Sequence, residues 1–402
     1  MNKRALAVLA ACFCTVFTTY AIRYSYGVLL PEMLPTLAIS KTEAGVIYAA
    51  YFIAYTVFSP VLGLLADRYD VRVLLTVFAA LLGGGTFLMA YSSSTVQASL
   101  FFALAGIGAS ACWAPAMALA QRWASDKRRG MTLAFIDVGS SLGVIWSGTV
   151  VPRIAMTYSW KTGWMSLGTL AFLLIVINFV MVRSHPAEQA TNGNPEIGRR
   201  PVESVRITYS RLLRDTRFWL IGLAYLLTGF SIIIPFTFLS TYAVQELAFS
   251  YEAATRLITV IGITAMVGKL VMGPYSDRIG RIKIMMLCTI LIAAGSLGMA
   301  YSRGWMLTLV TAIFGLGYGT VWSMYAASAS DYFSKELAGS VVGLWTFYLG
   351  IGSILAPVIA GWIADATGTL VWSFILAMAA AVISLFLLLT VWRASSGGSP
   401  GS

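Results

Sequence analysis

The sequence predicts an all-α membrane protein with twelve transmembrane helices in two pseudo-symmetric six-helix bundles. Three observations support this fold class: the composition, the spacing of apolar runs and an internal repeat. Hydrophobic residues make up 58% of the 402 residues and charged residues 11%, with a mean hydropathy of +0.81. A water-soluble surface with so few charges would aggregate, so we expect most apolar side chains to face lipid.

Apolar runs recur along the chain, each long enough to cross a hydrocarbon core of roughly 30 Å, which takes about 20 helical residues. The first run is too long for a signal peptide and has no small-residue cleavage site, so we expect a retained helix. The twelve runs span residues 6–30, 43–65, 72–91, 97–121, 131–152, 163–182, 218–243, 254–275, 284–301, 304–329, 338–362 and 371–392.

An internal repeat relates the two halves of the chain. The segment Gly63–Arg68 returns as Gly273–Arg278 after 210 residues, and Gly106–Trp113 returns as Gly315–Trp322 after 209. An even number of helices in each half makes both halves run in the same direction, so the pseudo-twofold axis lies along the membrane normal. A central cavity is expected between the halves.

The apolar pattern also predicts the domain boundaries. Residues 184–216 break the apolar pattern with prolines, an Asn-Gly-Asn-Pro run and five arginines, and are expected to form a cytoplasmic linker. An N-terminal six-helix bundle, residues 1–183, would precede this linker and a C-terminal bundle, residues 217–393, would follow it. Residues 394–402 are expected to form a flexible tail.

The net charge of +11 reports topology in this chain. With a cytoplasmic N-terminus, most of the 27 Lys and Arg residues fall on the cytoplasmic side. This positive-inside pattern predicts a multi-pass protein of the cell (inner) membrane with both termini in the cytoplasm, and it argues against a nucleic-acid partner. The exceptions are Lys41, Arg153, Lys161, Arg256 and Arg303 in outer loops, and Arg23 and Lys269 within helices.

Reactive side chains are too sparse for an enzyme site. The single histidine, His185, lies just past the sixth helix, so no histidine-centred catalytic or metal group can be built. The cysteines lack metal-site spacing and are expected to pack as small apolar residues. We therefore expect neither an enzyme, a cofactor nor a metal. The four cysteines are Cys12, Cys14, Cys112 and Cys288.

Three ionisable residues lie well inside predicted helices: Arg23, Asp137 and Lys269. A charge at the bilayer centre costs roughly 2.5–3.5 kcal/mol on insertion scales, so such residues normally face a watery cavity or a partner. Arg23 lies between Tyr20 and Tyr24, where its guanidinium can bind a carboxylate in bidentate fashion and the tyrosine hydroxyls add donors. A structural ion pair or a snorkelling arginine is the alternative.

Lys269 and Asp137 each have competing interpretations. Lys269 lies four residues before Gly273, near the membrane interface, where a lysine can either snorkel or contact an anionic ligand. Asp137 can carry a proton, balance Lys269 or Arg23 as a fixed counter-ion, or make a polar contact between helices.

Aromatic residues in predicted helices 4, 10 and 11 are candidates for lining the cavity. Packing, or a place in the interfacial aromatic belts, is the competing interpretation for each of them. Trp113 and Trp322 are equivalent under the repeat and are therefore the better candidates. The set comprises Trp113, Trp322, Tyr325, Trp345, Phe347 and Tyr348.

The loop after predicted helix 8 has the pattern G-x3-D-R-x-G-R, which starts at Gly273. It resembles the signature loop of the major facilitator superfamily, which follows helix 2 and recurs after helix 8. The copy after helix 2 is degenerate, because Asp70 stands where the family has glycine. The resemblance implies alternating access, and a gating role for the loop charges that latch neighbouring helix ends. These are Asp67, Arg68 and Arg72 in the first copy and Asp277, Arg278 and Arg281 in the second.

Predicted helices 1, 5 and 8 narrow the resemblance to one branch. Trp123, the run 127–129 of Lys-Arg-Arg, and Gly139–Gly143 resemble the monocarboxylate transporter signature, and Lys269 stands where that family has its helix-8 arginine. The chain departs from that family at four places, of which the first is a lysine instead of an arginine at 269. An acidic Gly-Gly-Trp lead-in is missing, Ala265 replaces an aspartate, and the family's helix-1 lysine aligns with Tyr24, one position after Arg23.

The intramembrane charges and the resemblance together favour a secondary transporter of a small organic anion. A monocarboxylate such as lactate or pyruvate is the first choice, moved by proton symport or by anion exchange. Arg23 and Lys269 would contact the carboxylate, and Asp137 would modulate charge or carry the proton. The expected partners are the carboxylate, protons and the lipid bilayer, and a monomer is expected. A proton-driven exporter of drugs or neutral metabolites and a transport-inactive sensor are the rival hypotheses.

Overall fold

A computed structural model describes residues 3–66, 69–124, 129–183, 212–333 and 335–396. Within these ranges every regular element is a helix, and twelve helical spans are long and apolar enough to cross a membrane. The predicted number of spans is therefore confirmed. Most of the predicted linker, residues 184–211, and the end of the predicted tail, residues 397–402, lie outside the described residues.

The first half of the chain contributes six spans, and two of these spans are divided into two elements. A 3-10 turn ends the third span, and a break divides the fourth. The elements are α1 (Lys3–Leu37), α2 (Lys41–Ala66), α3 (Val71–Leu88) with η1 (Met89–Tyr91), α4 (Thr95–Ser110), α5 (Ala114–Trp123), α6 (Arg129–Thr157) and α7 (Trp160–Met181).

The second half contributes six unbroken spans. Side chains cap the starts of two of them, since Asp215 accepts from the N–H of Arg217 and Ser250 from that of Ala253. The elements are α10 (Thr216–Gln245), α11 (Tyr251–Ile279), α12 (Arg281–Tyr301), α13 (Trp305–Tyr332), α14 (Lys335–Thr367) and α15 (Val371–Ser396).

Two predicted helices need correction. The first helix was expected to end near residue 30 but continues through Pro31 to Leu37. The predicted helix over 97–121 is not continuous, because it breaks after Ser110 and resumes at Ala114. Pro115 explains the break, since a proline has no N–H for the carbonyl four residues earlier and its ring clashes with that carbonyl.

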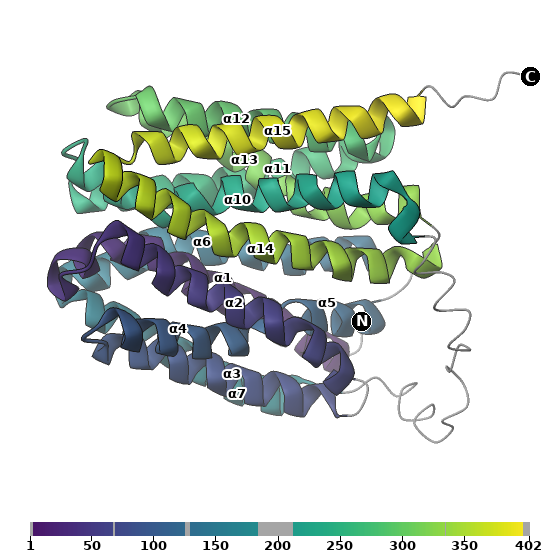
Figure 1. Cartoon of the computed structure of the whole chain (residues 1–402). Coiled ribbons are helices and arrows are strands. Elements are labelled where there is room, and N and C mark those ends of the chain that lie inside the picture. The colour runs from purple at the N-terminus through teal and green to yellow at the C-terminus, as the bar shows by residue number, and fades with distance from the viewer. Residues whose placement is uncertain (1–2, 67–68, 125–128, 184–211, 334, 397–402) are drawn as a thin grey trace, which may run out of the picture.

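The two halves lie side by side, and the chain enters and leaves at one end of the bundle (Figure 1). We call this end the terminal side; it holds the start of α1 and the end of α15. The opposite end, which holds the α1–α2 and α6–α7 connections, is the far side. Among the described residues the most extensive contacts between the halves are those of three helix pairs, namely α1 with α10, α2 with α14, and α6 with α11. The last two pairs are equivalent under the repeat, as pseudo-symmetry requires.

The halves are closed against each other on the far side. A Cβ added to Gly27 would clash with the carbonyl of Phe236 in α10, and one added to Gly45 with the backbone of Pro357 in α14. Near the terminal side, by contrast, a Cβ on Gly130 or Gly339 would meet no atom within 4 Å. Close helix approach through glycine therefore holds the far side together.

The α1–α10 crossing predicts a specific sensitivity. Gly27→Ala should destabilise the protein by about 1–3 kcal/mol, because the methyl group overpacks a backbone–backbone contact. Thermal unfolding of purified protein in detergent measures the loss. Gly84→Ala in α3 is the matched control, since its Cβ meets nothing within 4 Å and alanine has the higher helix propensity. Equal melting temperatures for the two variants would contradict a closed crossing at Gly27.

Candidate functional site

Arg23, near the middle of α1, lies inside a cage of aromatic rings. Its guanidinium carbon is 4.9 Å from the ring centroid of Tyr55, 5.2 Å from Tyr20, 5.4 Å from Tyr51 and 5.6 Å from Phe52. The residue is only 9% exposed. Ring faces attract a cation at such distances, so the cage stabilises the charge without neutralising it.

The guanidinium of Arg23 has no acidic partner in the part of the chain that the structure describes. Its Nε donates to the hydroxyl of Tyr51 at 3.3 Å, and no ion pair joins the guanidinium to a carboxylate of a described residue. A guanidinium without a carboxylate partner retains the fork of donors that binds an acceptor such as a carboxylate in bidentate fashion.

Neighbouring helices hold the cage in position. The Tyr48 hydroxyl donates to the backbone carbonyl of Arg23 at 3.1 Å, which ties α2 to α1. The Tyr51 ring lies 4.8 Å from the Phe102 ring, and a Cβ on Gly106 of α4 would clash with the Tyr51 carbonyl. The α2 wall of the cage is therefore packed from behind and has little freedom to move.

Sequence reasoning did not single out Tyr51, Phe52 or Tyr55. A signal for them exists, since Tyr48, Tyr51 and Tyr55 are spaced three and four residues apart and so share one face of α2. An aromatic face opposite an intramembrane arginine is what a caged cation requires.

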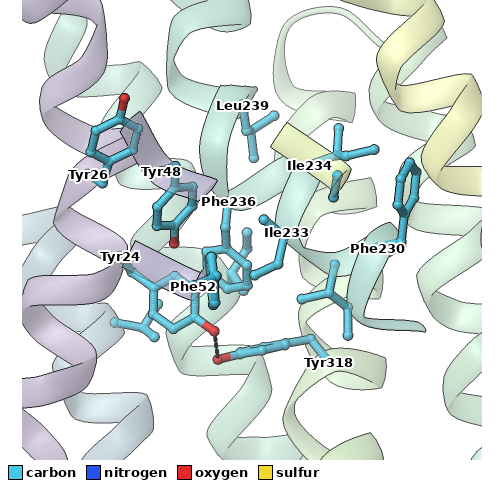
Figure 2. Packing of buried hydrophobic residues seen from close by; sticks show 14 of the residues in the cluster. Tyr24, Tyr26, Tyr48, Phe52, Phe230, Ile233, Ile234, Phe236, Leu239 and Tyr318 are labelled. Carbon is cyan, nitrogen blue, oxygen red and sulfur yellow. Dashed lines mark hydrogen bonds between the residues drawn. The ribbon is translucent and has the colours of Figure 1, made fainter. Parts of the chain in front are cut away.

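Tyr24 follows Arg23 but turns toward the other half of the molecule. Tyr318 of α13 donates a hydrogen bond to the Tyr24 hydroxyl at 3.0 Å, and the Tyr24 ring lies 4.0 Å from that of Phe236 in α10. Figure 2 shows this hydroxyl pair beside Phe236. Trp322 continues the aromatic surface, with its ring 6.3 Å from that of Tyr318. Residues from both halves thus meet at Tyr24, the residue that follows Arg23 in the sequence.

Lys269 of α11 and Asp137 of α6 form an ion pair that joins the two halves. The Lys269 Nζ lies 2.9 Å from Asp137 Oδ2, and it donates to Ser140 Oγ at 2.7 Å and to the Asp137 carbonyl at 3.2 Å. The side chains are 13% and 26% exposed, respectively. Of the two cations that the sequence offered as partners of Asp137, the structure pairs it with Lys269.

The remaining aromatic candidates make packing contacts. Trp113 begins α5, and its buried indole N–H has no described partner. Tyr325 is fully buried, shares a hydrogen bond with Thr228 at 3.0 Å and stacks on Tyr225 at 4.1 Å. Tyr348 meets the ring of Phe218 edge-on at 6.4 Å. The contacts of Tyr325 and Tyr348 lie within the second half, and the structure does not bring them together with Arg23.

The second copy of the signature loop binds within its own half. Arg281 donates to Asp331 at 2.6 Å and to the Ala327 carbonyl at 3.1 Å, and it lies 3.5 Å from Asp277. Arg278 is exposed. These contacts tie the start of α12 to the end of α13 and do not reach the first half.

The first copy is described only in part. Asp67 and Arg68 lie outside the described residues. The Arg72 guanidinium lies 4.1 Å from the ring centroid of Phe179 in α7, and its buried Nε has no partner among described residues. This contact also stays within one half.

A double-mutant cycle tests the Lys269–Asp137 pair. Lys269→Ala or Asp137→Ala alone should cost roughly 2–3 kcal/mol, less than a fully buried pair because both groups keep some solvent contact. The double variant should recover part of that loss, since no unpaired charge remains. Arg256→Ala, which breaks an exposed pair with Glu252, should cost at most about 0.5 kcal/mol. Thermal unfolding in detergent supplies all four values, and strict additivity of the two single losses would contradict the pairing.

Comparison with known proteins identifies a family. The model of the Major Facilitator Superfamily matches residues 12–268 and 223–401 of this chain. The fold is similar to that of a mutant form of the nucleoside transporter NupG, with a TM-score of 0.81, 14% sequence identity, and coverage of 96% of this chain and 100% of that one.

Characterised relatives resemble the chain over nearly its whole length. A hexuronate transporter of Bacillus subtilis (strain 168) is 24% identical, over 100% of this chain and 98% of the relative. The membrane sensor protein UhpC of Escherichia coli (strain K12) is 23% identical, over 95% and 92%. Monocarboxylate transporter 12 of Xenopus laevis is 20% identical, over 92% and 84%.

Proposed function

Because this chain belongs to the major facilitator superfamily and is a membrane transporter, we propose that it moves a small organic monocarboxylate and binds the carboxylate through Arg23. The substrate would enter between the two halves and be released after the halves rock about the site. The proposal covers the class of substrate and the residue that recognises it.

The observation that carries the proposal is the charge balance of the intramembrane residues. Lys269 is neutralised by Asp137, whereas no described carboxylate neutralises Arg23. An unpaired charge away from bulk water raises the free energy of the empty protein. Binding of an anion beside that charge removes part of this cost. One free positive charge favours a ligand with one negative charge over a dianion or a neutral solute. This balance replaces the expectation that both cations serve the substrate.

The geometry around Arg23 supports recognition of a carboxylate in particular. Tyr51 accepts from Nε, and the two terminal nitrogens of a guanidinium carry parallel donors that match a planar acceptor such as a carboxylate. The rings of Tyr20, Phe52 and Tyr55 surround the guanidinium and leave it little other space. Among the relatives, two are named for solutes that carry one carboxylate, hexuronate and a monocarboxylate, which supports the same class.

The proposed orientation follows from the basic residues. Under the positive-inside rule the terminal side is cytoplasmic and the protein is a multi-pass protein of the cell membrane. With the far side closed, the conformation described here would then be open toward the cytoplasm, and Arg23 would be reached from that side.

Energy coupling is proposed to involve the Lys269–Asp137 pair. A proton on Asp137 would remove the ionic attraction and leave Lys269 only its hydrogen bonds to Ser140 and to the Asp137 carbonyl, which would loosen the contact between α6 and α11. A proton would then promote the conformational change, as symport requires. If the pair stays intact through the cycle, exchange of one anion for another is the alternative, since each substrate would neutralise Arg23 in turn.

A sensor is the second candidate function, because one relative is named as a membrane sensor protein. A sensor would bind the same anion without moving it. Saturable flux in vesicles therefore separates the two candidates.

Uptake into proteoliposomes tests the proposal. A panel of labelled monocarboxylates, dicarboxylates and neutral analogues is offered with and without an imposed pH gradient. We expect saturable uptake of a monocarboxylate, with a gradient-driven overshoot for symport and with trans-stimulation by internal anion for exchange. Arg23→Ala should lower uptake at low substrate about a hundredfold, as expected for the loss of about 3 kcal/mol in hydrogen bonds to a charged group.

Arg256→Ala is the matched control, since Arg256 is an exposed arginine whose partner lies one turn away in the same helix. It should leave uptake unchanged. Uptake of neutral analogues as fast as of the acid, or full activity in a folded Arg23→Ala protein, would contradict the assignment.

A further inference from the structure

Two sets of hydrogen bonds cap the start of α2, and only the first comes from neighbouring residues. A helix begins with backbone N–H groups that have no partner inside the helix. Ser40 and Glu43 form a reciprocal capping box, in which the Ser40 N–H donates to Glu43 Oε2 at 2.8 Å and the Glu43 N–H to Ser40 Oγ at 3.1 Å. This box leaves the N–H groups of Lys41 and Thr42 without a local acceptor.

Asp365, near the end of α14 in the other half, accepts from both of those groups. Its Oδ1 accepts from the Lys41 N–H at 3.1 Å, and its Oδ2 from the Thr42 N–H at 2.8 Å and from the Thr42 hydroxyl at 2.5 Å. A carboxylate at a helix N-terminus is also favoured by the helix dipole. Three hydrogen bonds to one charged group thus cross from one half to the other on the far side.

The backbones are close enough for this contact to be specific. A Cβ on Gly361, one turn before Asp365, would clash with the Lys41 carbonyl. Glycine at that position therefore allows α14 to bring its carboxylate onto the first turn of α2. The contact is exposed to water on its outer side, so water can replace it when the halves separate.

The repeat shows that the fold does not require this contact. The equivalent interface joins α11 to α6, and Met156 of α6 stands where the repeat would place a mate of Asp365. There, Ser250 caps α11 from within its own chain segment, and Glu252 pairs with Arg256 of the same helix. One of two equivalent interfaces thus carries a polar bond between halves, and the other lacks it among the described residues.

We propose that Asp365 is a latch that holds the far side closed and biases the equilibrium between the two access states. The proposal concerns the conformational equilibrium of the empty protein and is independent of the solute that is carried. Loss of the latch favours the state in which the far side is open, because that state keeps all of its own contacts.

Double electron–electron resonance measures the effect directly. Spin labels are attached at Tyr158→Cys in the α6–α7 connection and Trp305→Cys at the start of α13, both 74% exposed, in a background that carries Cys14→Ser. In Asp365→Ala the population of long far-side distances should rise roughly fivefold to tenfold over the parent, in line with exposed hydrogen bonds to a charged group. Glu252→Ala, which removes a far-side carboxylate that binds only its own helix, should leave the distances unchanged.

Two results would overturn the latch. One is a distance distribution of folded Asp365→Ala that coincides with the parent; the other is an equal shift in Glu252→Ala. If Asp365→Ala does not yield monodisperse protein, Thr42→Val decides, because it removes one of the three hydrogen bonds and should raise the long-distance population about twofold. An unchanged distribution in Thr42→Val would then refute the proposal. No substrate is present, so failure of carboxylate uptake would not affect the outcome.

Discussion

The central physical constraint in this protein is the Arg23 guanidinium, which lies among aromatic rings of α1 and α2 with no described carboxylate beside it. Water and the ring faces stabilise the Arg23 charge only in part. Three features leave the Arg23 charge without a carboxylate partner among the described residues. Rings from α1 and α2 surround the guanidinium, α4 packs behind the α2 rings, and Asp137 is paired with Lys269. Under the proposed function, this unneutralised cation would attract an anionic substrate before any contact forms.

The contacts between the halves explain how such a site can be closed on one side. Backbone approach at Gly27 and Gly45, the Tyr24–Tyr318 hydroxyl pair and the Asp365 cap lie at the middle of the helices or toward the far side. The described signature-loop charges near the terminal side bind within each half instead. Close backbone packing and polar contacts therefore act together on the closed side, and of these the exposed polar contacts are the ones that water can replace.

The sequence predicted the spans from hydropathy, the repeat from a constant spacing of matching residues, and Arg23 as a candidate from its charge within an apolar run. Each of these signals is local or periodic along the chain. Partner choice was not visible: Asp137 had two candidate cations, and only the crossing of α6 with α11 selects Lys269. The spacing of the tyrosines in α2 predicts that they share one helix face. The sequence does not show that this face packs against Arg23 of α1. The break before Ala114 followed from Pro115, which the apolar run concealed. Asp365 lies beyond the predicted span over 338–362, and its hydrogen bonds go to a helix start more than 300 residues away, which no local pattern indicates.

Equilibrium binding of a matched set of ligands to the purified protein tests the central claim most directly. Lactate, the neutral lactamide and the dianionic malate differ mainly in charge, and calorimetric titration gives the affinity of each without any need for transport. A single unneutralised Arg23 predicts that lactate binds at least about tenfold more tightly than either of the other two, a difference of about 1.4 kcal/mol. Equal affinity for lactamide, or tighter binding of malate, would show that the site does not present one free positive charge.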